Sequence, residues 1–187
     1  MIRALLAILL IGFLVGCSRL TVSSVGPEQL LPVERSLWQL NIGSRQNPQF
    51  TGLLALRISG SGIEAVVLDS TGIKLLAEKI GPDGEIEVQT ALPVIREKGL
   101  PAFLGTGLHR IFQSAAGKTS VPCRQEFLLQ RCFGEKSNGR LIKSVGFGPF
   151  ELWSVEYLIN KERTEPGVSG AVLDSGWFIP LLRLERK

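Results

Sequence analysis

The sequence predicts an α+β fold in which a strongly curved antiparallel sheet is curled around a helical insert. Three observations support this prediction. Residues 50–88 alternate short apolar runs with turns rich in glycine, aspartate and serine, as successive hairpins do. Residues 93–113 instead repeat apolar side chains at steps of three and four, which is helical spacing. Strands resume at residue 127, so we expect the helical segment to cover the concave face of the sheet.

The first group of strands is predicted to be a meander that begins near Trp38. Leu54, Leu56 and Ile58 occupy alternate positions and should share one buried face. The run 63–68 is apolar on both faces, which predicts a central strand. The expected strands, separated by glycine-containing turns, are 50–59, 63–68, 73–80 and 85–88.

The helical insert is predicted to contain two short helices. Glycines at positions 99, 105 and 107 interrupt the pattern, and each costs about 1 kcal/mol relative to alanine inside a helix. One continuous helix over 93–113 is therefore not expected.

The second group of strands alternates most clearly over 151–159, where Trp153, Val155 and Tyr157 share one face. The dipeptide Asn138-Gly139 is typical of a hairpin turn. The expected strands are 127–133, 140–147, 151–159, 171–173 and 177–184.

The last strand contains Pro180, which has no backbone N–H to donate. A proline favours an edge strand or a bulge, so we expect one of these two positions. Residues 160–170 are mostly polar and are expected to form a loop.

The amino end has the pattern of an export signal. Arg3 precedes an apolar run over 4–15, which is too short to span a bilayer as a permanent helix. The run closes with Leu14-Val15-Gly16-Cys17, which resembles the bacterial lipobox. The resemblance implies that a diacylglycerol is attached to Cys17 and that the chain is cleaved after Gly16. The alternatives are an ordinary signal peptide or a short buried helix that ends in cysteine.

These features divide the chain into a signal peptide over 1–16, a lipidated tether over 17–36 and a single domain over 37–187. Removing 16 of the 187 residues leaves 171, enough for one domain with its own core. An aspartate after the lipidated cysteine commonly retains lipoproteins in the inner membrane of Gram-negative bacteria. Ser18 stands at that place, which implies an outer-membrane protein that faces the periplasm, for a Gram-negative host.

The charge of the mature chain is small. Of 21 basic residues Arg3 leaves with the signal peptide, and 17 acidic residues remain, so the net charge is about +3. The basic residues are scattered along the sequence rather than clustered, and no nucleic-acid partner is expected.

Besides Cys17 the chain has two cysteines, Cys123 and Cys132. An even pair in an oxidising compartment favours one disulfide. Two free thiols or a metal pair are the alternatives, and a metal is disfavoured because neither histidine nor further cysteine lies nearby.

Catalytic motifs are largely missing from the sequence. His109 is the single histidine, and it lies in the helical insert beside apolar residues, so a structural or surface role is expected. A Ser-His-Asp triad would have to use it, yet the chain has no Gly-x-Ser-x-Gly motif. The aspartates of the turns lack the spacing of a calcium loop. We expect neither an enzyme nor a bound metal or cofactor.

Several segments together resemble the LolA/LolB-like superfamily, most closely a branch of uncharacterised outer-membrane lipoproteins. They are the lipobox at Cys17, the stretches 51–56 and 67–76, the helical insert, the strand at 153–157 and the polar loop with Pro166. The resemblance implies a half-open β-barrel of about eleven strands, lidded by helices, with a cavity for acyl chains. In the LolB receptor an exposed leucine before a glycine protrudes from a loop between strands. The matching residue here is Thr71, a candidate for membrane contact.

The resulting hypothesis is an outer-membrane lipoprotein that binds or transfers a lipid-like ligand, either an acyl compound or a lipoprotein, in an apolar cavity. The alternatives are a fully packed core without a cavity, and a structural or assembly lipoprotein that binds another envelope protein. The residues expected to line the cavity are Leu54, Leu56, Val67, Trp153, Val155 and Tyr157.

Overall fold

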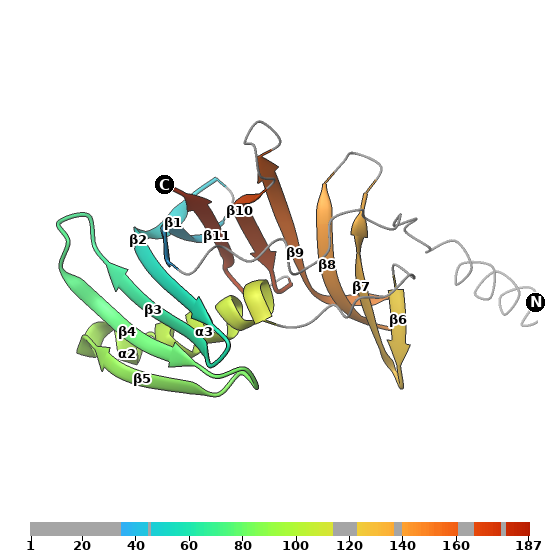
Figure 1. The fold of residues 1–187 in the computed structure, drawn as a ribbon, viewed down its shortest axis with the longest axis horizontal. Coiled ribbons are helices and arrows are strands. Elements are labelled where there is room, and N and C mark those ends of the chain that lie inside the picture. Colours follow the sequence, from blue (N-terminus) through green and yellow to red (C-terminus); the bar gives the residue numbers. More distant parts are fainter. Residues whose placement is uncertain (1–34, 45, 114–122, 137–139, 161–166, 177–178) are drawn as a thin grey trace, which may run out of the picture.

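A computed structural model describes residues 35–187 except 45, 114–122, 137–139, 161–166 and 177–178. The described residues form one antiparallel sheet of eleven strands, in the order β5-β4-β3-β2-β1-β11-β10-β9-β8-β7-β6 (Figure 1). The strands are β1 Arg35–Gly43, β2 Pro48–Ser59, β3 Gly62–Leu68, β4 Lys74–Ile80, β5 Ile86–Ala91, β6 Cys123–Glu126, β7 Leu129–Glu135, β8 Leu141–Phe147, β9 Phe150–Asn160, β10 Gly167–Asp174 and β11 Leu181–Arg186.

Two meanders meet at the centre of the sheet, where β1 pairs with β11. The helical insert leaves β5 at one edge and precedes β6 at the other edge. It contains the helices α2 Pro93–Glu97 and α3 Leu100–Leu108, followed by a π-helical turn, His109–Gln113. The strand–helix–strand order and the two short helices predicted from the sequence are therefore confirmed.

The prediction of a strongly curved sheet is wrong: the sheet is open and is not strongly curled. The insert explains this difference. Helix α3 has nine residues and is about 14 Å long, whereas eleven strands extend over about 50 Å. Such a short helix can pack against only a few of the strands, so the rest of the sheet has no helix among the described residues around which to curve.

The core lies between α3 and the strands around the β1–β11 junction. Trp38, Leu54, Leu104 and Leu184 are fully buried there. Gly107 lies so close to β11 that a Cβ atom would stand 2.6 Å from a methyl group of Leu182. Gly105 is equally close to Ile86 in β5, at 2.7 Å. The glycines that weaken the helix therefore allow it to approach the sheet.

The structure differs from the expected strand boundaries in the second meander. Phe127 and Leu128 form the tip of the β6–β7 hairpin rather than the start of a strand. β10 begins at Gly167, inside the expected polar loop, because Val168 is buried in the core. Pro180 precedes β11 and is not part of it. β11 is a central strand, so the expected edge strand or bulge at Pro180 is not found.

The predicted disulfide is present. Cys123 in β6 and Cys132 in β7 are directly opposite each other and are bonded. The bond fixes the hairpin that forms one edge of the sheet. At the other end of the domain, β1 begins at Arg35, two residues before the expected start. Cys17 and the signal peptide lie outside the described residues.

Candidate functional site

The helical insert covers only part of its face of the sheet. Helix α3 contacts β4 and β5 and lies against β11, and the π-helical turn reaches β8 and β9. Beyond that point, inward-facing Leu129 and Phe133 of β7 are only half-buried. An open groove of about 530 Å³ lies there. It is lined by His109, Arg110, Leu129, Arg131, Val145, Leu152, Trp153, Ser175 and Ile179.

Arg110 is the central polar residue of this groove. Its guanidinium carbon lies 5.4 Å from the ring centroid of Trp153, and its Nη1 donates a hydrogen bond to Ser175 Oγ at 3.0 Å. Partial burial lowers the pKa of the Arg110 guanidinium, which nonetheless stays charged at neutral pH. Within the described part of the chain, no carboxylate forms an ion pair with it. A guanidinium has five N–H donors, so Arg110 retains donors for an anion.

Two buried side chains fix the position of the π-helical turn. Lys143 Nζ and Tyr157 Oη both donate hydrogen bonds to the carbonyl oxygen of Ile111, at 3.0 and 2.6 Å. The last carbonyls of a helical segment lack intrahelical partners, and these two side chains satisfy that of Ile111. Burial lowers the pKa of Lys143 to about 7 and raises that of Tyr157. We call Lys143, Tyr157 and the Ile111 carbonyl the clamp.

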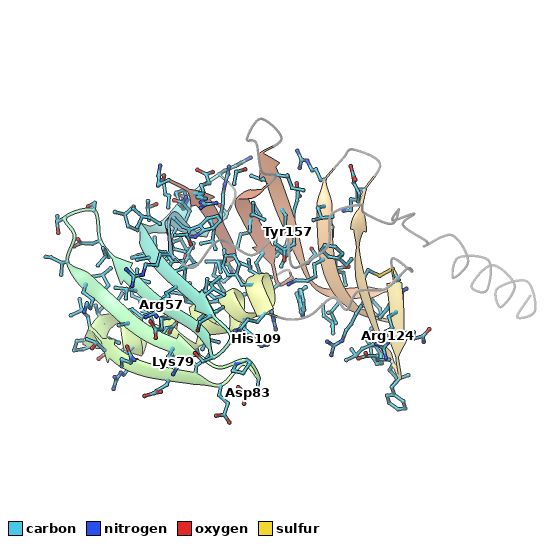
Figure 2. All side chains as sticks on the ribbon, in the orientation of Figure 1. Arg57, Lys79, Asp83, His109, Arg124 and Tyr157 are labelled. Atoms are coloured by element: carbon cyan, nitrogen blue, oxygen red, sulfur yellow. A yellow bond between two sulfur atoms is a disulfide. The ribbon has the colours of Figure 1, made fainter. Side chains whose placement is uncertain are left out.

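His109 joins the helical insert to the β4–β5 turn. Its Nε2 lies 3.2 Å from the carbonyl oxygen of Pro82, and its ring packs beside Gly84. Figure 2 shows His109 at the end of the helical insert, above the β4–β5 turn that carries Asp83. The contact joins the insert to that turn.

Glu78 in β4 is the most unusual buried residue. It is 1% exposed, and neither of its carboxylate oxygens has a hydrogen-bond partner. It faces the core between Leu76 and Ile80, opposite Ala65 and Val88 of the neighbouring strands. Burial raises its pKa to about 8. β4 and β8 are seven positions apart in the sheet, about 33 Å, so the amine of the clamp does not compensate this carboxylate.

The structure places one of the six expected lining residues, Trp153, in the groove. Tyr157 belongs to the clamp. The remaining four are packed in the hydrophobic core: Leu54, Leu56, Val67 and Val155. The groove residues that sequence reasoning missed are mainly Arg110 and Arg131. The alternating pattern of 129–135 could have indicated Arg131, which occupies an inward-facing position between Leu129 and Phe133.

Thr71 lies in the β3–β4 loop, at the opposite end of the molecule from β6 and β7 (Figure 1). Its N–H and hydroxyl both donate to Asp69 Oδ1, at 2.8 and 2.7 Å. These bonds lower the pKa of the Asp69 carboxyl. The exposed apolar residue of this loop is Ile73, with 59% of its surface accessible.

The residues that the structure describes contain no group of three or more histidine, cysteine or acidic side chains that could hold a metal. None of the helices among them is long and apolar enough to cross a membrane.

The sequence matches no protein-family model, and no curated protein matches it significantly.

Proposed function

We propose that this protein is a LolA/LolB-like outer-membrane lipoprotein, anchored through Cys17, that binds or transfers an anionic lipid-like ligand in the groove beside Arg110. The observation that carries the proposal is the combination of apolar walls with a guanidinium that has no carboxylate partner among the described residues. An acyl chain would lie along Val145, Leu152 and Trp153. Its carboxylate or phosphate would accept hydrogen bonds from Arg110.

The size and position of the groove support this assignment. Its volume of about 530 Å³ lies within the range of roughly 300–1,000 Å³ that is usual for small-molecule sites. Its walls come from β7–β9 and the β10–β11 loop, while the clamp holds the end of the insert in place. The strands and the clamped end of the insert therefore provide preformed walls, which lowers the entropic cost of binding. The proposal assigns no catalytic residue.

A fluorescent fatty acid titration tests the proposal. The mature chain, residues 17–187 with Cys17→Ser, should take up the fatty acid saturably from solution. Arg110→Gln should weaken binding about tenfold or more, because a hydrogen bond to a charged group contributes about 1.5–3 kcal/mol. The same substitution should not affect the uptake of an uncharged fatty alcohol.

Arg57→Gln is the matched control. Arg57 is exposed on the face of β2 opposite the core and pairs with Glu64 at 3.6 Å. The Arg57→Gln variant should bind fatty acid like the parent protein. A parent protein that binds no fatty acid, or an Arg110→Gln variant that binds as well as Arg57→Gln, would refute the proposal.

The second candidate is a non-catalytic lipoprotein that binds another envelope protein. A second groove, of about 420 Å³, crosses β1, β11, β10 and β9 on the face opposite α3. Its charged residues already form the pairs Arg183–Glu185 and Arg140–Glu156. Such a surface suits a polar polypeptide better than an acyl chain. Saturable fatty acid uptake that depends on Arg110 would favour the first candidate.

A further inference from the structure

Large apolar side chains are exposed at the tips of two adjacent hairpins. Phe127 and Leu128 form the β6–β7 tip, with 89% and 52% of their surfaces accessible. Phe147 and Phe150 flank the β8–β9 turn and are 45% and 69% accessible. We call these four residues the apolar tips.

The pairing of the strands brings the apolar tips to one end of the sheet. Leu129, which follows the first tip, is opposite Phe147 in the β7–β8 ladder. Phe147 is opposite Phe150 in the β8–β9 ladder. The two turns therefore protrude side by side, at the lower right of Figure 1.

The exposed Phe127 has an unfavourable backbone conformation. Its φ is 56°, the one left-handed value found among the described residues other than glycine. This conformation is unfavourable for a residue with a Cβ atom, and strain of this kind is concentrated at functional sites. The most exposed aromatic side chain thus occurs at the one described non-glycine position with a left-handed backbone.

The apolar tips continue into the groove of the proposed function. Leu129 links them to it, and Leu152 and Ile179, which line the groove, are each 46% accessible. A ligand that moves between a bilayer and the groove would therefore stay in contact with apolar side chains. A flat or concave protein-binding surface would not require apolar groups at two protruding turns.

We propose that the apolar tips insert into the surface of a lipid bilayer and place the groove against it. This inference rests on the proposed lipid anchor. The mature chain before β1 comprises residues 17–34, and eighteen residues reach at most about 60 Å. The bilayer is therefore always within reach of the domain, at a high effective concentration. Arg124 and Arg131 beside the first tip share the acidic partner Glu126, and Glu151 follows Phe150 at the second tip, so the local charge is balanced and the apolar side chains carry the inference.

Vesicle binding tests the inference. The mature chain with Cys17→Ser is sedimented with vesicles of phosphatidylethanolamine and phosphatidylglycerol. The double variant Phe127→Ser/Phe150→Ser should bind at least tenfold more weakly. Ile73→Ser, which removes an exposed apolar residue from the distant β3–β4 loop, should bind like the parent.

Three results would overturn the inference: a parent chain that does not bind vesicles, a double variant that binds them like the parent, or loss of vesicle binding in Ile73→Ser alone. A parent chain that dimerises through the tips without binding vesicles would assign them to a second copy instead. A second measurement does not depend on a loss of vesicle binding. Phe127→Trp should add tryptophan fluorescence that is quenched when the vesicles contain lipids with brominated acyl chains. Fatty acid uptake without vesicles should survive in the double variant, so failure of this inference differs from failure of the proposed function.

Discussion

Replacement of Glu78 by glutamine should stabilise the protein at pH 8 and leave its stability nearly unchanged at pH 5. The Glu78 carboxyl is 1% exposed and has no hydrogen-bond partner. Its ionised form is therefore penalised by burial, without an opposite charge or a donor to offset the cost. Glutamine has almost the same shape but cannot ionise, so it removes only the charge.

The magnitude follows from the pKa difference between the folded and unfolded chain. Burial raises the pKa from 4.5 to about 8. The stability present below pH 4.5 is therefore lost as the pH rises toward 8, at about 1.4 kcal/mol for each pH unit. This gives an upper limit of about 5 kcal/mol at pH 8. Since water penetration and relaxation reduce such penalties, we expect a gain of about 2–3 kcal/mol for Glu78→Gln.

Urea unfolding of the mature chain with Cys17→Ser, with and without Glu78→Gln, measures this gain at pH 5, 6.5 and 8. Lys143 titrates in the opposite sense: burial lowers its pKa to about 7, so its contribution grows as the pH rises above 7. It is common to both proteins and cancels in the difference.

Glu64→Gln is the matched control for Glu78→Gln. Glu64 is a half-exposed glutamate on the neighbouring strand β3, and its replacement should change stability by less than about 1 kcal/mol at every pH. A Glu78→Gln gain that stays constant from pH 5 to pH 8 would refute the reasoning, because it would show that the carboxyl is equally charged in the folded and unfolded states.

Three further predictions concern the backbone, the clamp and the disulfide. Gly62→Ala should lower the free energy of unfolding by at least about 2 kcal/mol in a thermal melt. Gly62 has φ 129°, and a Cβ atom there would stand 2.1 Å from a carbonyl oxygen. Gly60→Ala is the control: Gly60 has open space around it, so the loss should be less than about 0.5 kcal/mol. Tyr157→Phe should lower the free energy of unfolding by about 1 kcal/mol, since one of two hydrogen bonds to a buried carbonyl is lost; an unchanged value would contradict the clamp. Reduction of Cys123–Cys132, whose sequence separation is 9, should cost about 2–3 kcal/mol, and identical urea curves with and without dithiothreitol would contradict this.

The order of elements could be predicted from the sequence because it depends on local periodicity. The insert stands out through its helical spacing, and the alternation of 151–159 marks β9. The β6–β7 tip was misread for a related reason: Phe127 and Leu128 are apolar, and an apolar hairpin tip has the same pattern as a strand. Periodicity records which residues are apolar, but it does not record which of them are buried.

The buried charges could in part have been found by the same reasoning. Glu78 lies between Leu76 and Ile80, and Lys143 between Leu141 and Val145, so both occupy inward-facing positions of their strands. Their surroundings depend on tertiary contacts that a strand pattern does not contain. The pattern cannot show that Lys143 reaches a carbonyl of the insert while Glu78 reaches nothing.

The cavity-lining residues were misplaced because the extent of the insert along the sheet is a tertiary property. Gly105 and Gly107 draw α3 onto β5 and β11, so the inward-facing side chains of the first meander become closed core. The clamp ties the π-helical turn to β8 and β9, and among the described residues a groove lies beside it. The packing of α3 against β4, β5 and β11 thus supplies much of the buried core. The strands beyond it can then present the polar residues of the groove and the apolar tips with little loss of that packing. Substitution of the polar groove residue Arg110 should therefore alter ligand binding with little effect on unfolding, whereas substitutions at the two glycines should do the reverse.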